Sequence, residues 1–412
     1  MREMKDSGVE WIGEIPYTWD LSKIGAIYRE RNTKVSDTEY EPLSVTKQGI
    51  VPQLETAAKS DNGDNRKLIK RNDFVINSRS DRRGSCGISK YDGSCSLINI
   101  VLKPKNTMCN QYYDFVFHTE LFADEFYRWG NGIVDDLWST KWSNMKRIYI
   151  PVPLFAEQVK ISSYLDSKCS QIDAIIAREQ AVIEKLKEYK LSVITEAVTK
   201  GLNPDVPMKD SGVEFIGLIP NDWNVIKFGR CVTIESNLVS PIDYYDYPQI
   251  SPESIEKNSS KLLTYKLVKD SGVISWNHLF FKGQIIYSKI RPMLNKVIIA
   301  PFDGLCSADM YPMETDYNRN FVVYLMLSKY FTSQVGLVTE NRVKMPKINQ
   351  NELSNLIVVL PNETEQREIV SFLDEKVRKI DIVITCKQSL IEKLTEYKKS
   401  LIYEVVTGKK EV

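Results

Sequence analysis

The sequence of 412 residues contains few of the side chains that usually perform chemistry. It has two histidines, His118 and His278, and each stands alone among aromatic and aliphatic residues, which predicts packed side chains. Its seven cysteines are scattered, and no C-x-x-C pair occurs. We therefore expect no zinc site, and we expect reduced, mostly buried thiols.

The motifs of common catalytic sites are also missing. The sequence has no G-x-x-x-x-G-K-[ST] loop, no G-x-G-x-x-G after a strand and no G-x-S-x-G elbow. It also lacks the Asn/Asp-Pro-Pro-aromatic motif that is typical of adenine methyltransferases. These absences predict a chain with no catalytic residue, no metal and no cofactor of its own.

Long apolar runs are absent too. No stretch approaches the ~20 apolar residues that a membrane-spanning helix needs, and the first residues do not form a signal pattern. The sequence thus predicts a cytoplasmic protein without a membrane partner. The net charge of +1 argues weakly against a nucleic-acid binder, but the distribution of charge matters more than its sum.

The sequence contains two copies of one pattern in the same order. KDSGVEWIGEIP (5–16) returns as KDSGVEFIGLIP (209–220), identical at ten of twelve positions. EQVKISSYLDSKCSQID, from Glu157, returns as EQREIVSFLDEKVRKID, from Glu365, and IEKLKEYKLSVITEAVT (183–199) returns as IEKLTEYKKSLIYEVVT (391–407). The offsets of 204 and 208 residues indicate two half-length copies fused head to tail. Such a chain suits a target with two parts, or two partners.

The segments between the repeated phrases share a rhythm but little identity. Apolar runs predict strands at 73–78, 97–102 and 147–152 in the first copy, and at 284–290, 296–300 and 356–360 in the second. Amphipathic patterns predict one helix at 111–129 and one at 320–335. The matching order predicts a mixed α/β fold that is used twice with different surfaces.

The repeated segments that follow each middle predict long helices, uninterrupted by Gly or Pro over 158–200 and 366–407. Heptad spacing predicts a coiled-coil seam, for which we name Leu165, Ile172, Ile175, Leu186, Val193, Leu373, Ile380, Val383, Leu394 and Leu401. Helices of ~36 residues would be ~54 Å long. We expect the two helices to pair antiparallel, with pseudo-twofold symmetry, whereas a parallel pair would place both globular domains at one end.

Several repeated phrases are recognisable. SGVEWIGEIPYTW and SGVEFIGLIPNDW, the helix openings PVPLFAEQ and LPNETEQ, and the endings ITEAVTKG and IYEVVTGK resemble the specificity subunit of type I restriction–modification systems. The resemblance covers the whole chain in order. It implies target-recognition domains at 1–154 and 202–361 and spacer helices at 155–201 and 362–412.

The same resemblance implies a function. Each recognition domain would read one half of a bipartite site in double-stranded DNA, and the helices would set the gap. Two methyltransferase subunits would dock on the repeated parts, and restriction (motor–nuclease) subunits would complete the assembly. The subunit itself would be non-catalytic, with S-adenosylmethionine, ATP and Mg on its partners.

Basic residues gather midway through each half, and such side chains neutralise phosphates and read base edges. Residues 66–90 hold eight basic and two acidic side chains. The candidate DNA-binding residues of the first half are Lys47, Gln48, Ser78, Arg79, Arg82, Arg83 and Lys90. Those of the second half are Ser288, Lys289, Arg291, Asn295, Lys296, Arg342, Lys344 and Lys347; 289–296 (KIRPMLNK) resembles a loop common in second domains of this family.

Two other functions remain open from the sequence alone. A two-headed protein-binding adaptor on a helical ruler would need the same repeats, and the near-zero net charge is compatible with it. An enzyme hidden in one globular domain is less favoured, because an enzyme built of two copies would normally keep its catalytic residues in both.

Overall fold

The computed structural model describes residues 2–54, 63–105, 107–132, 138–214, 216–340, 342 and 346–412. The chain forms two compact units, one of Met1–Glu179 with Ser389–Val412 and the other of Gln180–Gln388. The division falls inside the two long helices, α5 (Phe155–Lys200) and α10 (Glu363–Val406), so each unit contains part of both. We call the described residues up to 154 head 1, and those between 202 and 361 head 2.

The elements of head 1 are short. In chain order they are β1 (Met4–Asp6), β2 (Glu14–Pro16), β3 (Asp20–Lys23), α1 (Ile24–Ile27), β4 (Tyr28–Glu30), β5 (Lys34–Val35), β6 (Leu43–Thr46), β7 (Gly49–Pro52), β8 (Arg66–Ile69), β9 (Phe74–Asn77), η1 (Ser80–Arg82), β10 (Cys86–Ile88), β11 (Gly93–Cys95), β12 (Asn99–Pro104), α2 (Asn110–Phe117), α3 (Glu120–Arg128), α4 (Trp142–Met145) and β13 (Tyr149–Val152).

Head 2 follows α5. Its elements are β14 (Met208–Asp210), β15 (Leu218–Pro220), β16 (Asn224–Lys227), η3 (Phe228–Arg230), β17 (Thr233–Ile234), β18 (Leu238–Val239), η4 (Pro241–Tyr244), β19 (Pro248–Ile250), η5 (Pro252–Ser254), β20 (Lys266–Leu267), α6 (Val268–Ser271), β21 (Asn277–Phe280), β22 (Ile285–Ser288), η6 (Pro292–Leu294), β23 (Val297–Ile299), β24 (Gly304–Ser307), β25 (Met310–Glu314), α7 (Arg319–Leu327), α8 (Lys329–Thr339), α9 (Gln350–Ser354) and β26 (Ile357–Leu360).

The two heads have the same sheet topology. A four-stranded antiparallel sheet has the order β10-β9-β12-β4 in head 1 and β23-β22-β25-β17 in head 2. A second sheet has the order β11-β8-β5 in head 1, and β24-β21-β18 extended by β19 and β20 in head 2. The six strands expected from the sequence are confirmed as β9, β12, β13, β22, β23 and β26. One mixed α/β fold is therefore built twice from dissimilar residues.

The expected single helices at 111–129 and 320–335 are wrong, because each is broken in two. In the first pair, Thr119 lies between α2 and α3 as the N-cap of α3. Its Oγ1 accepts a hydrogen bond from the Phe122 backbone N–H at 3.3 Å. Ser328 acts in the same way between α7 and α8, where the Phe331 N–H donates to its Oγ at 3.4 Å. In both heads the apolar pattern of the sequence continues across the break. A hydroxyl side chain nevertheless ends one helix there, because it caps the start of the next.

The repeated phrases contact each other inside each unit. The Trp19 indole N–H donates to a carboxylate oxygen of Glu157 at 2.9 Å, and Trp223 donates to Glu365 at the same distance. Burial raises the pKa of Glu365, and the bond from Trp223 opposes that shift. The repeated hairpin and the repeated helix opening are therefore a matched pair, which explains why both are kept in both copies.

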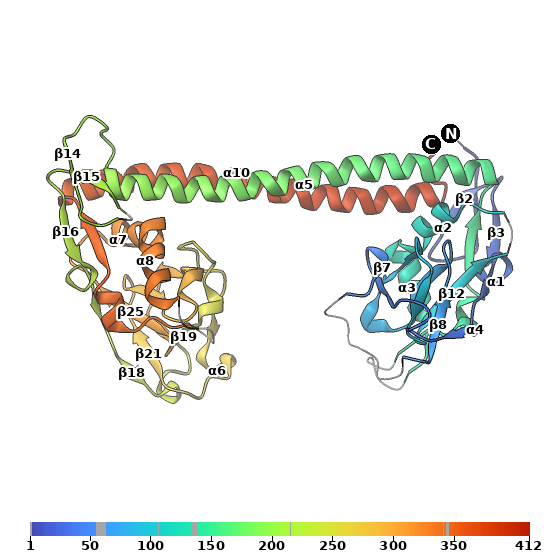
Figure 1. The fold of residues 1–412 in the computed structure, drawn as a ribbon, viewed down its shortest axis with the longest axis horizontal. Helices are drawn as coiled ribbons and strands as arrows, with labels where there is room; N and C mark the ends of the chain where they lie inside the picture. The colour runs from blue at the N-terminus through green and yellow to red at the C-terminus, as the bar shows by residue number, and fades with distance from the viewer. Residues whose placement is uncertain are drawn as a thin grey trace. The chain divides into compact units, whose positions relative to one another are not determined.

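Each head packs on the start of one long helix and the end of the other (Figure 1). The core of the first unit includes Leu165 of α5 with Leu401 and Val405 of α10. The core of the second unit includes Ile194 of α5 with Leu373 of α10. The two helices consequently run antiparallel within each unit, as the sequence predicted.

The residues named for the coiled-coil seam differ in how far they are buried. Leu165, Ile172, Leu373, Ile380 and Leu401 are buried, and Leu186, Val193 and Leu394 are half-buried. Ile175 and Val383 are 45% and 42% exposed, because the adjacent Ile176 and Ile384 face inward instead. Because apolar residues are adjacent at these positions, the sequence allows two heptad phases. The structure has the phase that places Ile176 and Ile384, not Ile175 and Val383, toward the other helix. The helices are also longer than expected, at 46 and 44 residues, or roughly 69 and 66 Å.

Two ion pairs hold the helix register. In the first unit the Lys398 ammonium lies 2.7 Å from Asp173, and in the second unit Lys190 lies 2.7 Å from Asp381. Asp173 and Lys190 of α5 are the repeat counterparts of Asp381 and Lys398 of α10, so each copy supplies one acid and one base. The same 17-residue spacing on both helices gives both units the same antiparallel register.

Among the described residues no single helix is long and apolar enough to cross a membrane. Only α7 and α8 taken together reach that length and composition, and they bend by 60° between them.

The register pairs generate a stability prediction. Lys190→Glu should lower the free energy of unfolding by about 1 kcal/mol, because it replaces an attraction to the partly exposed Asp381 by a repulsion. The double exchange Lys190→Asp with Asp381→Lys should recover most of the loss in urea unfolding. Lys185→Glu, on an exposed position of the same helix, is the control. An equal loss for Lys185→Glu would mean that the pair does not stabilise the seam.

Candidate nucleic-acid interface

The two loops expected to contact DNA occupy the same place in the two heads. One connects β9 to β10 and the other connects β22 to β23, beside the centre of the four-stranded sheet. Pairing with β12 and β25 makes Asn77 equivalent to Ser288, so that Ser78 matches Lys289. Ser78 and Ser288, both candidates from the sequence, therefore do not occupy equivalent positions.

A polar residue at the end of each strand shapes the loop that follows. The Asn77 side-chain oxygen accepts from the Arg79 backbone N–H at 3.0 Å, and the Ser288 hydroxyl donates to the Ile290 carbonyl at 3.1 Å. Both loops then form a turn of 3-10 helix, η1 and η6. Arg291 begins η6 with a φ of 44°, a left-handed conformation that costs free energy for a residue with a Cβ.

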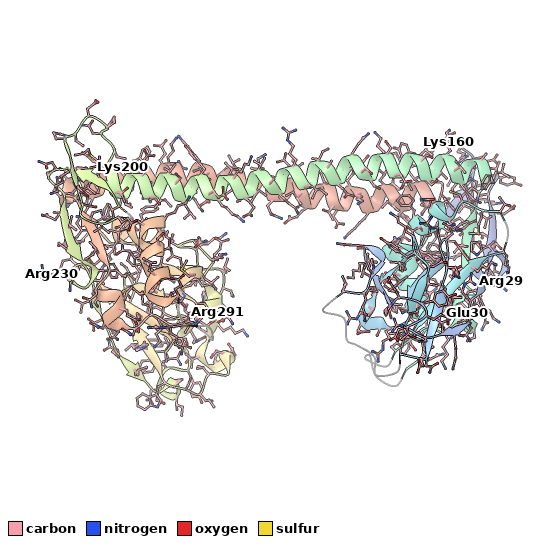
Figure 2. The ribbon with its side chains drawn as sticks, in the orientation of Figure 1. Arg29, Glu30, Lys160, Lys200, Arg230 and Arg291 are labelled. Carbon is pink, nitrogen blue, oxygen red and sulfur yellow. The ribbon has the colours of Figure 1, made fainter. Side chains whose placement is uncertain are left out.

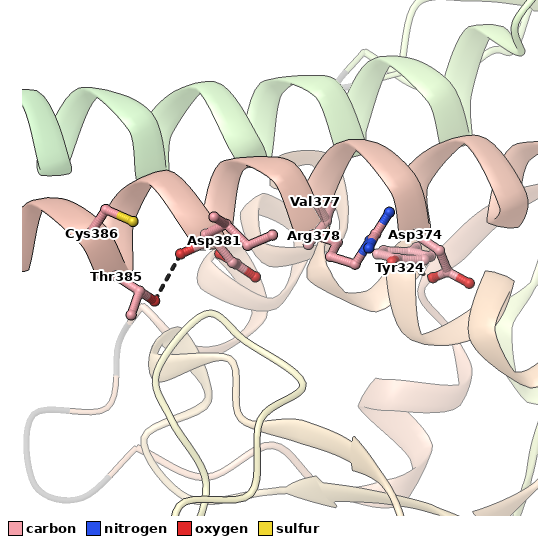
Figure 3. A pocket seen from close by; sticks show the side chains of 8 residues that line it. Tyr324, Asp374, Val377, Arg378, Asp381, Thr385 and Cys386 are labelled. Carbon is pink, nitrogen blue, oxygen red and sulfur yellow. Dashed lines mark hydrogen bonds between the residues drawn. The ribbon is translucent and has the colours of Figure 1, made fainter.

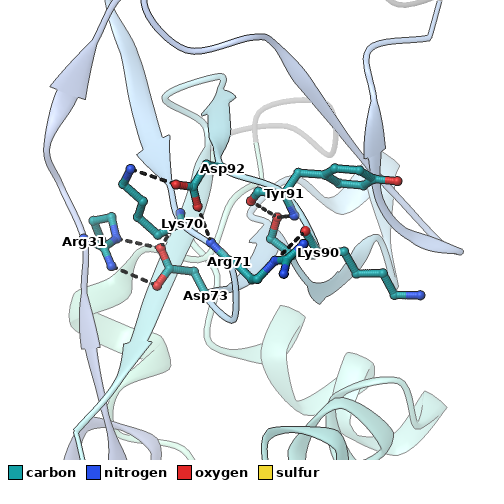
Figure 4. Close-up of polar contacts among 8 residues, drawn as sticks. Arg31, Lys70, Arg71, Asp73, Lys90, Tyr91 and Asp92 are labelled. Carbon is teal, nitrogen blue, oxygen red and sulfur yellow. Dashed lines mark hydrogen bonds and ion pairs between the residues drawn. The ribbon is translucent and has the colours of Figure 1, made fainter.

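Much of the basic run 66–90 is used inside head 1. The buried Arg66 guanidinium donates to the Ser94 hydroxyl at 2.8 Å, and the Lys67 ammonium donates to the Asn99 carbonyl at 2.9 Å. Lys70 pairs with Asp92 at 2.9 Å (Figure 4), and the pKa of Asp92 is lowered first by the Arg71 N–H and then by Lys70. The positive charge counted in the sequence thus overstates the charge offered to a ligand.

Ser78 and Arg79 line a groove of about 620 Å³. One wall is the end of β9 with the start of β12, and the other is the segment from Ser139 to Lys146. Ser78 is buried and Arg79 is half-buried. The Thr140 N–H donates to the Ser78 carbonyl at 3.0 Å and joins the two walls.

Lys47, Gln48 and Lys90 lie in a different groove, of about 1040 Å³, between head 1 and the helices of its own unit. Its walls include Asp114 and Asp166. Burial raises the pKa of both carboxyl groups, and His118 opposes the shift at Asp114. The structure therefore does not bring Lys47, Gln48 and Lys90 together with Ser78 and Arg79, and the lining of their groove mixes basic and acidic side chains.

The second unit has a related groove of about 490 Å³ between α7 and α10 (Figure 3). The Tyr324 hydroxyl donates to Asp374 at 2.7 Å, and burial with this carboxylate raises the pKa of Tyr324. Asp374 is the repeat counterpart of Asp166. Carboxylates thus recur where a head meets the long helices.

Arg82 and Arg83 are exposed at η1. The Arg82 guanidinium lies 3.5 Å from Asp81, and Arg83 pairs with Asp124 while lying over the Tyr127 ring at 5.7 Å. Both side chains can reach solvent, although each already has an acidic neighbour.

In head 2, several candidates support the loop rather than face solvent. Asn295 is 1% exposed and donates to the Met326 carbonyl at 2.9 Å, while Lys296 donates to the Pro252 carbonyl at 2.6 Å. Ser288 is also buried. These three residues are better placed to hold the loop than to contact DNA.

Other basic candidates of head 2 have acidic partners. Arg342 pairs with Glu352, and Lys347 lies 3.0 Å from Asp309. Lys344 lies outside the described residues. Lys289 lies over the Tyr311 ring at 5.1 Å, and Arg291 is exposed at the surface of head 2 (Figure 2). Lys289 and Arg291 are therefore the candidates that the loop offers to a ligand.

The two histidines are at least half-buried, and five of the seven cysteines are buried, whereas Cys109 is half-buried and Cys386 is exposed. His278 is 4% exposed, and burial lowers its pKa, with a smaller contribution from Lys289. His118 is half-buried, and one ring nitrogen lies 2.8 Å from the Asp114 carbonyl oxygen. In the part of the chain that the structure describes, no group of His, Cys, Asp and Glu could hold a metal ion.

Comparison with known proteins shows which family this chain resembles. Residues 220–393 match the model of the type I restriction modification DNA specificity domain. The chain is 32% identical over 276 residues to the type I restriction enzyme EcoDI specificity subunit of Escherichia coli, across 63% of this chain and 62% of that one. Residues 220–393 thus match a type I restriction modification DNA specificity domain, and the chain is similar to type I restriction enzyme specificity subunits.

A further relative covers more of this chain. The MjaVIII specificity subunit of Methanocaldococcus jannaschii is 24% identical over 436 aligned residues, across 96% of this chain and 93% of the relative. The match to the EcoDI subunit, by contrast, spans less than two thirds of that protein.

Solved structures share the fold. A chain from a type I restriction–modification system, solved in work on complex assembly and conformational transition, has a TM-score of 0.72 at 12% identity, and the match covers 96% of this chain and 99% of that one. The HsdS subunit of Thermoanaerobacter tengcongensis has a TM-score of 0.51 at 13% identity, with coverage of 96% and 98%. At these identities the likeness concerns the fold alone.

Sequence reasoning missed part of the groove around Arg79. Lys141, Trp142 and Lys146 line it together with Arg79, although they follow it by more than 60 residues. The short run KWSNMKR (141–147) contains the only available signal, because its basic residues flank a tryptophan. The groove becomes visible only once the chain returns beside β9.

Proposed function

We propose that this chain is the sequence-specific DNA-binding subunit of a type I restriction–modification complex, and that each head reads one half of a bipartite, asymmetric site. The supporting observation is the loop after β9 and β22, which has the same place in both heads but different side chains. An unchanged frame with unequal loops suits a target whose two halves differ in sequence. The recognition domains would be 1–154 and 202–361.

The readout would divide between phosphates and bases. Lysines such as Lys289 would neutralise phosphates, which gives affinity without sequence preference. Arg79 and Arg291 can each present two donors to one guanine in the major groove. The remaining candidates would shape the loops that carry these side chains.

The spacer helices, 155–201 and 362–412, would set the distance between the half-sites. Half-sites one helical turn of DNA apart are separated by ~34 Å, which helices of roughly 69 and 66 Å can accommodate. The repeated hairpins and helix openings would present equivalent surfaces to two methyltransferase subunits.

Restriction subunits would complete this assembly in the cytoplasm. S-adenosylmethionine, ATP and Mg would be bound by the partner subunits, and this chain would catalyse neither methyl transfer nor cleavage. The repeated hairpins support the two-partner assignment because the Trp19–Glu157 and Trp223–Glu365 bonds make them alike.

The first prediction separates a DNA reader from a protein-binding adaptor. The full chain with its methyltransferase partner should bind a random 40-bp duplex with an affinity that falls steeply between 50 and 200 mM salt. Fluorescence anisotropy measures the affinity, with the methyltransferase alone as control. Salt-insensitive or absent binding would favour the adaptor.

The second prediction concerns the two loops. Once methylome sequencing has given the bipartite site, Arg79→Ala and Arg291→Ala should each weaken binding by roughly tenfold or more, through one half-site only, because one guanine contact is worth about 1–3 kcal/mol. Duplexes with one half scrambled identify which half-site is affected. Arg29→Ala and Arg230→Ala, at exposed positions of heads 1 and 2 (Figure 2), are the controls. An equal effect on both half-sites would refute the two-reader model.

The third prediction concerns the spacer. Deleting residues 179–185 with 386–392 removes one heptad from each helix between the two register pairs, and leaves both pairs intact. The preferred gap should shorten by about three base pairs, since seven residues span ~10 Å and a base pair ~3.4 Å. Binding to duplexes with graded gaps measures the change. Deletion of 179–185 alone should impair folding, and an unchanged gap in the paired deletion would exclude the helices as the ruler.

A further inference from the structure

The groove beside Arg79 is held in a defined shape by hydrogen bonds from its far wall. Ser139 forms a strand-like bridge with Arg79, and the Thr140 N–H donates to the Ser78 carbonyl at 3.0 Å. The buried Thr140 hydroxyl donates to the Phe126 carbonyl at 2.7 Å, and the Asn144 amide donates to the Trp129 carbonyl at 2.8 Å. The short helix α4 and its flanking residues, Lys141 and Lys146, are thus fixed next to Arg79.

The charge in this groove is strongly one-sided. Among the described residues that line it, Glu30 is the only carboxylate, and it lies 3.2 Å from the buried Lys67. Among the described lining residues, Arg79, Lys141 and Lys146 then remain as three cations with no further carboxylate on the groove walls. Lys141 and Lys146 are both exposed, so they can reach a ligand at the mouth of the groove. An extended polyanion fits this distribution.

Head 2 has the same backbone at this place but different chemistry. Ile290 forms a bridge with Lys347, as Arg79 does with Ser139, and the Ile348 N–H donates to the Lys289 carbonyl at 3.0 Å. This register makes Asn349, the N-cap of α9, the counterpart of Lys141, the N-cap of α4.

The second lysine of the groove is replaced as well. Lys146 packs against Gly25 in head 1, and Ser354 packs in the same way against the equivalent Gly229 in head 2. Ser354 is therefore the counterpart of Lys146. Both lysines of head 1 therefore have neutral counterparts in head 2. On this wall of head 2, Lys347 and Arg342 are paired with Asp309 and Glu352, and the other nearby basic residues, Lys289 and Arg291, belong to the loop that faces the wall.

We propose that Lys141 and Lys146 anchor the DNA backbone beside Arg79, and that head 2 has no equivalent anchor. This inference rests on the DNA-binding function proposed above and assigns its electrostatic part mainly to head 1. Phosphate contacts give salt-dependent affinity, whereas base contacts depend on sequence. Head 1 thus supplies most of the non-specific affinity for DNA. Binding by head 2 depends more on the contacts of its loop with the bases.

The test compares charge removal inside and outside the groove. In the full chain with its methyltransferase partner, Lys141→Ala with Lys146→Ala should reduce the slope of log affinity against log salt by about two, one for each lost phosphate contact. Affinity for a random 40-bp duplex at 0.1 M salt should fall on the order of tenfold or more. Lys34→Ala with Lys103→Ala, exposed on β5 and β12 of head 1 and outside the lining of the groove, is the matched control and should change little.

Two further measurements make the outcome decisive. Lys141→Arg with Lys146→Arg keeps both charges and should retain the slope, which separates a lost charge from a damaged fold. The scrambled-half duplexes should show that the alanine pair weakens binding whichever half-site is present. Suppose that the unchanged chain binds with the expected salt dependence. An unaltered slope in the alanine pair, or an equal loss of affinity and slope in the control pair, would then overturn this inference alone. Absence of salt-dependent binding by the unchanged chain would instead overturn the proposed function.

Discussion

The contact on which the structure depends is the antiparallel packing of α5 against α10 within each unit. Each head buries its apolar residues against the start of one helix and the end of the other, as Leu165 with Leu401 and Ile194 with Leu373 illustrate. Hydrophobic burial has no direction of its own, so the register needs polar groups. The Asp173–Lys398 and Lys190–Asp381 pairs supply it, because an ion pair is satisfied in only one alignment.

The repeat acquires a physical meaning from this packing. Residues that are alike in both copies are those that join hairpin to helix, such as Trp19 with Glu157 and Trp223 with Glu365. Residues that differ lie in the heads, where the sheets are the same but the loops after β9 and β22 are not. A frame that needs the same contacts twice can be kept while the exposed loops change, since loop side chains contribute little to the core.

The unequal loops also change how charge should be counted. The basic run of head 1 looks like one surface in the sequence, yet Arg66 and Lys67 are buried, Lys70 is paired with Asp92, and Lys90 lies in a separate groove. In head 2 the ion pairs of Arg342 and Lys347 leave Lys289 and Arg291 as the basic side chains of the loop that face outward. A charge is available to DNA only where folding has not already given it a partner.

The sequence by itself determined the repeat, six of the strands and the two long helices, because these depend on periodicity and on the similarity of distant segments, and it favoured an antiparallel pair over a parallel one. It did not determine the helix phase, since Ile175 and Ile176 fit it equally well, or the breaks at Thr119 and Ser328, where a cap competes with an apolar pattern. Only the tertiary structure decided that Lys141 and Lys146 lie beside Arg79 while Lys47, Gln48 and Lys90 do not. A binding surface is formed by chain segments that are adjacent in space. Segments that are far apart in the sequence carry no local pattern that predicts this adjacency.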